Sequence, residues 1–128
     1  MTRVLVAEDD VDIRNLLTLA LSLQHFDVVE AFDGKDAIEK ARHHHPDILL
    51  LDIIMPLLNG FEVCEMIKND DELKNTPIIF ISAKIDQEEV QKSRSLGVET
   101  MIEKPFDFSF LVSRIQLLLD TSNKDGCA

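Results

Sequence analysis

Short apolar runs alternate with longer segments of helical periodicity along the whole chain, and this alternation constrains the fold more than any other feature. The apolar runs cover residues 4–7, 26–31, 48–51, 78–81 and 98–102. Between and after them, apolar residues recur three and four positions apart over residues 11–23, 35–43, 60–69 and 108–119. Residues 86–96 are interpreted as a weakly apolar, highly charged helix with Val90 as its main apolar residue. Parallel strands need long crossover connections, which are usually helices. The pattern therefore predicts an α/β protein, a doubly wound (βα)5 sandwich in which helices cover both faces of a five-stranded parallel sheet.

The chain has 128 residues, which is the usual size of one domain. The run Ile48-Leu49-Leu50-Leu51 is continuously apolar, as expected for a strand that is covered on both faces. The last helical stripe ends at Leu119 and is followed mainly by small and polar residues. We therefore expect one domain over residues 1–120, with residues 121–128 as a C-terminal tail or the start of a linker.

The chain is strongly acidic, with 24 acidic and 13 basic residues and a net charge of −11. Phosphate backbones and anionic membrane surfaces repel such a domain, so we expect neither direct nucleic-acid binding nor membrane binding. No apolar run approaches the roughly 20 residues that span a bilayer. Met1-Thr2-Arg3 leads directly into the first apolar run without the pattern of a secretory leader, and we expect a cytoplasmic protein.

The cysteines and a histidine run are interpreted as structural or surface features. Two cysteines are too few for a disulfide framework. Cys64 lies among apolar residues at helical spacing, which favours a core thiol, whereas Cys127 lies among polar residues. The run His43-His44-His45 could suggest metal binding. Consecutive histidines at a helix end cannot all face one ion, so a surface position is favoured.

Polar side chains follow four of the apolar runs. Glu8, Asp9 and Asp10 follow the first run, Asp52 the third, Ser82 the fourth and Lys104 the fifth. Ligands of open α/β sheets bind outside the carboxyl ends of the strands. We therefore expect carboxylates, a hydroxyl and an amine to meet at one edge of the sheet. Asp10 or Asp12 is also a candidate N-cap of the first helix.

This set of side chains favours phosphoryl chemistry. Crowded carboxylates repel one another unless a cation joins them. Mg²⁺ prefers oxygen ligands and is often held by one or two carboxylates together with a phosphate. Asp52 is a candidate nucleophile, because aspartate can accept a phosphoryl group covalently. Lys104 and the hydroxyl of Ser82 could then contact phosphoryl oxygens.

Five segments together resemble the receiver domain of two-component response regulators, over about residues 3–119. They are VLVAEDD at 4–10, PDILLLDIIMP at 46–56, NG at 59–60, PIIFISA at 77–83 and EKPF at 103–106. Each segment alone is weak evidence, but their order and spacing are highly specific. The resemblance implies a flavodoxin-like fold with strand order 2-1-3-4-5.

The resemblance also implies a role for each residue at the edge. Asp52 corresponds to the phosphoacceptor and, with Asp9, to a direct ligand of Mg²⁺, for which Mn²⁺ can substitute. Glu8 usually acts on the metal through water, and the backbone carbonyl of Ile54 would be a further ligand. Lys104 corresponds to the amine that pairs with the phosphoryl group, and its bond to the following proline is commonly cis in this family.

Two further positions concern switching. Ser82 corresponds to the switch hydroxyl that moves toward the phosphoryl group, with serine in place of the commoner threonine. The family usually has an aromatic residue three positions before the lysine, and here that residue is Met101. Methionine is flexible and can fill the same space, but it offers no large ring or hydroxyl. We therefore expect the coupling through Ser82 to be weaker or to be read differently.

The resemblance implies a signalling domain rather than an enzyme. A sensor histidine kinase or a histidine phosphotransfer protein would donate the phosphoryl group, and the domain would catalyse its own phosphorylation and dephosphorylation. Ile54 and Lys84 would flank the approach of the hydrolytic water. The signal would pass through the fourth helix, fifth strand and fifth helix to an output domain or a downstream protein. Both a monomer and a phosphorylation-dependent dimer are compatible with the sequence.

The sequence leaves three other interpretations open. A degenerate receiver acting as an unphosphorylated interaction module rests on Met101 alone. A phosphatase of the haloacid dehalogenase type needs a second aspartate two residues after Asp52, where Ile54 stands. A flavin mononucleotide module needs a loop that accepts phosphate after the first strand, and the acidic residues 8–10 oppose this.

Overall fold

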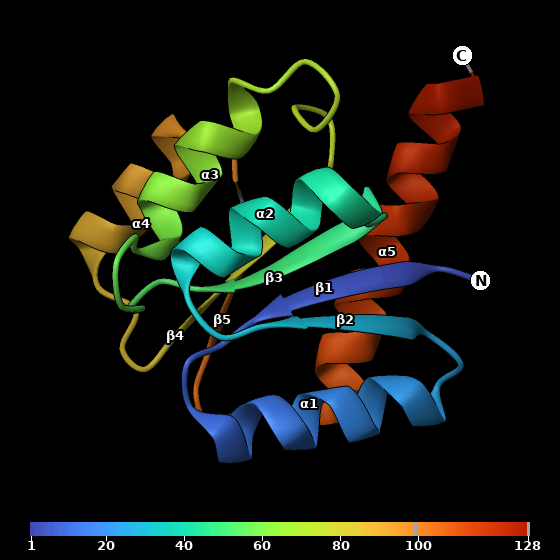
Figure 1. Cartoon of the computed structure of the whole chain (residues 1–128), viewed down its shortest axis with the longest axis horizontal. Helices are drawn as coiled ribbons and strands as arrows, with labels where there is room; N and C mark the ends of the chain where they lie inside the picture. The colour runs from blue at the N-terminus through green and yellow to red at the C-terminus, as the bar shows by residue number, and fades with distance from the viewer. Residues whose placement is uncertain (99, 128) are drawn as a thin grey trace.

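A computed structural model describes residues 1–98 and 100–127, with side chains described as far as residue 121. Five parallel strands form one sheet in the order β2-β1-β3-β4-β5 (Figure 1). The strands are β1 (Arg3–Ala7), β2 (Asp27–Ala31), β3 (Ile48–Asp52), β4 (Ile78–Ser82) and β5 (Met101–Glu103). The helices are α1 (Val11–Leu23), α2 (Gly34–His44), α3 (Gly60–Lys68), α4 (Gln87–Ser95) and α5 (Phe108–Cys127). The predicted doubly wound fold and strand order are confirmed.

The sheet separates two hydrophobic cores because successive side chains of a strand point to opposite faces. Leu5 and Ala7 of β1 pack with the buried residues of α2 and α3, whereas Val4 and Val6 pack with those of α1 and α5. Every residue of β3 and β4 is buried. The central strands are thus covered on both faces, as their continuous apolar runs predict.

The last strand and the last helix differ from the sequence prediction in their bounds. β5 covers Met101–Glu103 rather than residues 98–102, because its ladder pairs Met101 with Phe80 and Glu103 with Ser82. Val98 is buried before the strand begins, and residue 99 lies outside the described residues. α5 continues beyond Leu119 to Cys127, so the helix includes most of the predicted tail. Adding a residue to an existing helix fixes only that residue for one new hydrogen bond, which favours such extension.

α4 is attached to the sheet by little apolar contact. Of its residues, all of which the structure describes, Ser93 alone is buried. The helix begins at its N-cap Asp86, whose side chain accepts a hydrogen bond from the backbone N–H of Glu89. A helix with so little buried apolar surface depends on its polar contacts to stay in place.

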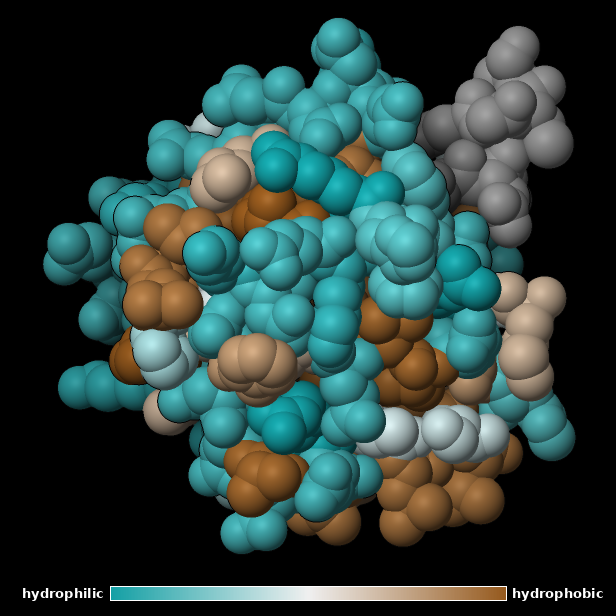
Figure 2. All heavy atoms as spheres, in the orientation of Figure 1, coloured by the Kyte–Doolittle hydropathy of each residue, from teal (hydrophilic) through white to brown (hydrophobic). Residues whose placement is uncertain are grey.

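The surface of the domain is largely polar on the face that Figure 2 draws. Figure 2 shows a mainly hydrophilic face with several hydrophobic patches. Within the described part of the chain, none of the helices combines the length and hydropathy needed to cross a membrane.

Cys64 is a free, buried thiol of α3, as predicted. His43 and His45 are exposed, which agrees with the predicted surface position of the histidine run.

Candidate functional site

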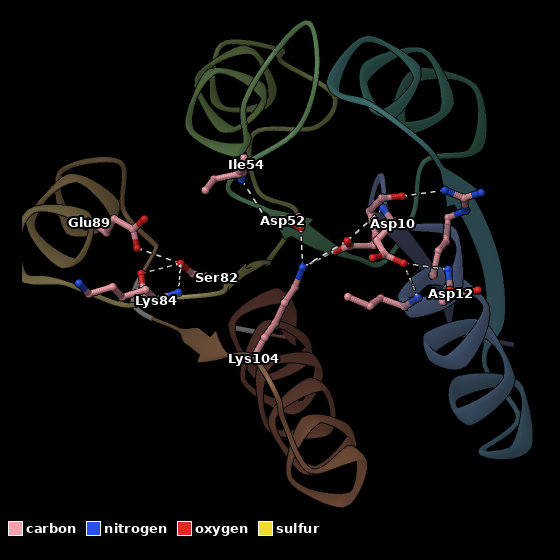
Figure 3. A network of polar contacts seen from close by, with 11 residues as sticks. Asp10, Asp12, Asp52, Ile54, Ser82, Lys84, Glu89 and Lys104 are labelled. Atoms are coloured by element: carbon pink, nitrogen blue, oxygen red, sulfur yellow. Dashed lines mark hydrogen bonds and ion pairs between the residues drawn. The ribbon is translucent and has the colours of Figure 1, made fainter.

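The polar residues predicted to meet do lie at one edge of the sheet. Glu8 and Asp9 follow β1, Asp52 ends β3, Ser82 ends β4 and Lys104 follows β5. All strands are parallel, so their carboxyl ends share this edge. Figure 3 shows Lys104 extending from the end of β5 toward Asp52 at the end of β3.

Lys104 connects two buried carboxylates. Its Nζ lies 2.7 Å from Oδ2 of Asp52 and 3.0 Å from Oε2 of Glu8. Glu8 is 1% exposed and Asp52 is 5% exposed, so solvent screens these charges little. The peptide bond between Lys104 and Pro105 is cis, as the resemblance implied.

Three carboxylates at this edge lie close enough to share one ion. Ligand atoms of Glu8, Asp9 and Asp52 all lie within 4.8 Å of one another. Burial, followed by the neighbouring Asp52, raises the pKa of Glu8 from its ordinary value to about 7. The single positive charge of Lys104 therefore does not fully offset the carboxylates. An all-oxygen set of this kind suits a hard divalent cation such as Mg²⁺.

The contacts with Asp52 and Glu8 favour the charged form of Lys104. Burial by itself lowers the pKa of Lys104. Its hydrogen bonds to Asp52 and Glu8 outweigh burial, so the pKa of the amine is raised. Lys104 therefore stays charged, and a fixed cation lies against Asp52 at neutral pH.

The loop after β3 fixes the backbone around Asp52. The N–H of Ile54 donates to Oδ1 of Asp52 at 3.1 Å, which leaves Oδ2 for Lys104. Gly60 donates its N–H to the carbonyl of Ile53 at 2.8 Å. A Cβ at Gly60 would lie 2.6 Å from the backbone oxygen of Asp52, so a larger residue would push the loop from the strand end. Part of the Asn59-Gly60 motif is thus explained by close packing against the site.

The end of β1 is fixed from α1. Asp10 is the N-cap of α1, as predicted, and its side chain accepts from the N–H groups of Asp12 and Ile13. Arg14 donates from Nη1 to the carbonyl oxygen of Glu8 at 2.8 Å, and its Nε lies 3.5 Å from Oε1 of Glu30. Arg14 was not predicted from the sequence to support the site. The one feature of the sequence that could have indicated this role is the position of Arg14, a basic residue one helical turn after the N-cap Asp10.

Ser82 reaches the same edge but does not join the carboxylate cluster. Its Oγ lies 2.8 Å from the carbonyl oxygen of Lys84 and 3.0 Å from Oε2 of Glu89, which are two acceptors for its single proton. Figure 3 shows this group of contacts on the α4 side, apart from the contacts of Lys104. Glu89 was not predicted as a site residue, because its position three residues after the N-cap Asp86 is typical of a residue that supports the helix terminus.

Met101 is also linked to α4. Its sulfur lies 3.3 Å from Oγ of Ser93, whose single hydroxyl proton also has the carbonyl oxygen of Val90 as an acceptor at 3.1 Å. Met101 is partly buried and pairs with Phe80 in the ladder between β4 and β5. Met101 therefore contacts Ser93, which is the one buried residue of α4 among its nine residues, all of which the structure describes.

Fold and site together define a doubly wound α/β protein with an acidic, lysine-bridged site at the carboxyl edge of its sheet. The family model of the response regulator receiver domain matches residues 4–116. The chain belongs to the response regulator receiver domain family.

The chain is similar to curated proteins in sequence and to solved structures in fold. The chain is 35% identical over 119 residues to the response regulator ArlR of Staphylococcus aureus, covering 93% of this chain and 53% of that protein. The chain thus spans about half the length of the curated relatives it matches. The chemotaxis protein CheY4 of Vibrio cholerae is 28% identical, with a TM-score of 0.88 over 92% of this chain and 98% of that one. A CheY-like receiver domain from Methanospirillum hungatei has the same fold, with a TM-score of 0.92, 22% identity and 98% of both chains covered.

Proposed function

We propose that this domain accepts a phosphoryl group on Asp52 from a phosphohistidine of a sensor histidine kinase or a histidine phosphotransfer protein. The observation that carries the proposal is the 2.7 Å contact between Asp52 and Lys104 beside two further carboxylates. In the reaction, a carboxylate oxygen of Asp52 forms a bond to phosphorus while the phosphorus–nitrogen bond breaks. The electron pair of that bond stays on the imidazole of the donor, and an aspartyl phosphate remains.

Each residue of the site has a task in this reaction. The N–H of Ile54 holds Oδ1 of Asp52 and leaves the other oxygen free to react once Lys104 moves to the phosphoryl group. Asp9, Asp52 and the backbone carbonyl of Ile54 would hold Mg²⁺ or Mn²⁺, with Glu8 acting through water. A bound divalent ion would neutralise part of the charge of the carboxylates and of the incoming phosphoryl oxygens.

The output of this reaction would be a change at the face formed by α4, β5 and α5. Phosphorylation adds about −1.5 to −2 charge at the site. Ser82 would turn to a phosphoryl oxygen, and Met101 would report the change in place of the usual aromatic ring. The weak apolar attachment of α4 supports this proposal, because a weakly held helix responds to small changes in contact energy. The reader of this face would be an output domain or a separate protein, with or without dimerisation of the receiver.

Intact mass after incubation with Mg²⁺ and acetyl phosphate tests the proposal. We expect the chain to gain the mass of one phosphoryl group, and we expect no gain without Mg²⁺ or in Asp52→Asn. A folded wild-type chain that gains nothing would overturn the proposal. That outcome would support a degenerate receiver that acts as an interaction module.

A further inference from the structure

The hydroxyl of Ser82 is engaged by α4. A serine hydroxyl has one proton to donate. Here Oγ faces two acceptors, the carbonyl of Lys84 at 2.8 Å and the carboxylate of Glu89 at 3.0 Å. The same Oγ accepts the N–H of Lys84 at 3.2 Å. Ser82 is 2% exposed, so water does not readily replace these partners.

Glu89 is held in a position to keep this contact. Its N–H donates to Oδ1 of the N-cap Asp86 at 2.8 Å, so its backbone is fixed in the first turn of α4. Its side chain is partly buried beside the end of β4. A hydrogen bond to a carboxylate is stronger than one to a neutral carbonyl. Glu89 is therefore the partner that favours the present orientation of Ser82 most.

We infer that Glu89 is a positioning residue, which holds the Ser82 hydroxyl toward α4 and thereby opposes its capture by a phosphoryl group on Asp52. The inference rests on the proposed function and adds a specific competitor to it. The carboxylate of Glu89 and the phosphoryl oxygens are both anionic acceptors, and one proton serves one of them at a time. The free energy that the hydrogen bond between Ser82 and Glu89 contributes to the unphosphorylated domain is lost when Ser82 turns to the phosphoryl group.

The same competition links the site to α4. When Ser82 leaves Glu89, the first turn of α4 loses its side-chain bond to the end of β4. One turn further along, Ser93 keeps its contact with Met101 of β5, since that contact does not involve Ser82. Phosphorylation would therefore loosen the start of α4 while the buried Ser93 still anchors its second half. By reciprocity, a partner that binds α4 with its first turn displaced would favour phosphorylation.

The test is a comparison of Glu89→Ala with Glu88→Ala. Both residues lie in the first turn of α4, and either change removes one negative charge near the site. Glu88 is exposed and so provides the control for charge. The probe is beryllofluoride, a phosphoryl mimic, titrated at saturating Mg²⁺ and followed by amide NMR. We expect Glu89→Ala to bind beryllofluoride about fivefold to tenfold more tightly than Glu88→Ala, as fits the loss of one charge-assisted competing hydrogen bond.

A double-mutant cycle separates positioning from a general effect on helix stability. In a Ser82→Ala background the competitor has nothing to hold, so Glu89→Ala should leave the affinity for beryllofluoride unchanged. Ser93→Ala should loosen α4, as shown by faster amide exchange there, without the same gain in affinity. Thermal unfolding of each variant confirms that the fold is intact.

The outcomes for the two proposals are distinct. Equal affinities of Glu89→Ala and Glu88→Ala, with wild type binding normally, would overturn the inference and leave the proposed function standing. An effect of Glu89→Ala that persists in the Ser82→Ala background would also overturn it. Absence of Mg²⁺-dependent binding in the wild-type chain, or equal binding by Asp52→Asn, would instead count against the proposed function.

Discussion

Arg14 and Glu8 are joined by a hydrogen bond between a side chain and the main chain, in which Nη1 of the arginine donates to the carbonyl oxygen of the glutamate at 2.8 Å. The bond crosses from α1 to the end of β1, where two of the three clustered carboxylates stand. Arg14 is thus the support of a backbone segment whose side chains are the proposed metal ligands.

Replacing Arg14 by Gln should therefore weaken Mg²⁺ binding by about tenfold, the lower end of what loss of an outer support costs a metal site. Isothermal titration of Mg²⁺ measures this. Lys40→Gln is the matched control, because Lys40 also donates to a strand carbonyl, that of Glu30 at 2.6 Å, and also loses one positive charge. The loss of one positive charge by itself would strengthen cation binding, so equal losses of affinity in both variants would contradict a specific supporting role of Arg14.

The affinity for Mg²⁺ should rise with pH as Glu8 loses its proton. Burial and the neighbouring Asp52 raise the pKa of Glu8 to about 7 in the metal-free domain. Below this pH most molecules carry the proton, and a cation must displace it. Affinity should therefore increase between pH about 6 and about 8, and this step should be absent in Glu8→Gln. An identical pH profile in wild type and Glu8→Gln would contradict the assignment.

The raised pKa of Glu8 should also make the stability of the metal-free domain fall with rising pH, whereas the affinity for Mg²⁺ rises. The folded metal-free domain keeps the proton on Glu8 up to pH about 7, whereas a carboxyl with the ordinary pKa of 4.5 loses it earlier. Between pH 4.5 and about 7 the unfolded chain thus binds fewer protons than the folded one. The free energy of unfolding should therefore fall as the pH rises through this range. Urea unfolding of wild type and Glu8→Gln without divalent ions shows the difference.

Ile54→Asn should shorten the half-life of the aspartyl phosphate several-fold. The side chain of Ile54 is 70% exposed beside Asp52, where an amide in its place could hold a water through a hydrogen bond. Loss of phosphoryl mass after removal of the donor gives the half-life. Leu57→Asn is the control, since Leu57 is an equally exposed residue of the same loop with a φ of 70° that asparagine tolerates. An unchanged half-life in Ile54→Asn would refute the role of this side chain.

Cys64 should be chemically inert while the domain is folded. It is fully buried in α3, and burial raises the pKa of its thiol to about 11. Only the thiolate reacts with iodoacetamide. In a Cys127→Ser background we expect no labelling at neutral pH until denaturant is added. The folded chain also retains this proton longer than the unfolded one, so the free energy of unfolding should fall between pH about 9 and about 11. Rapid labelling of the native protein would contradict the inertness, and a free energy of unfolding that stays constant over this pH range would contradict the raised pKa.

The residues at the carboxyl edge could be predicted because topology alone brings them together. Once the alternation indicates a parallel sheet, Glu8, Asp52 and Lys104 must share an edge, whatever the side-chain detail. The supporting contacts depend on tertiary distances instead. Nothing in the local sequence shows that Arg14 reaches back to a strand carbonyl, or that Glu89 contacts a serine rather than its own helix terminus.

The two differences in element bounds have similar causes. The start of β5 depends on its pairing with Phe80 and Ser82, and hydrophobicity at Val98 indicates burial without indicating ladder pairing. The length of α5 beyond Leu119 depends on continued backbone hydrogen bonding through residues that lack an apolar stripe. Sequence periodicity reports which residues are buried, and it is silent where burial and secondary structure do not coincide.

The lysine bridge also has a consequence for the order of events in synthesis. Its partners lie 96 and 52 residues earlier in the chain, and no shorter segment contains all three groups. A nascent chain that has not yet released residue 104 from the ribosome therefore lacks the cation that would engage a phosphoryl group. Competence to receive a signal would arise only when the sheet is complete, so that unfinished or misfolded copies of the chain would not draw phosphoryl groups away from finished ones.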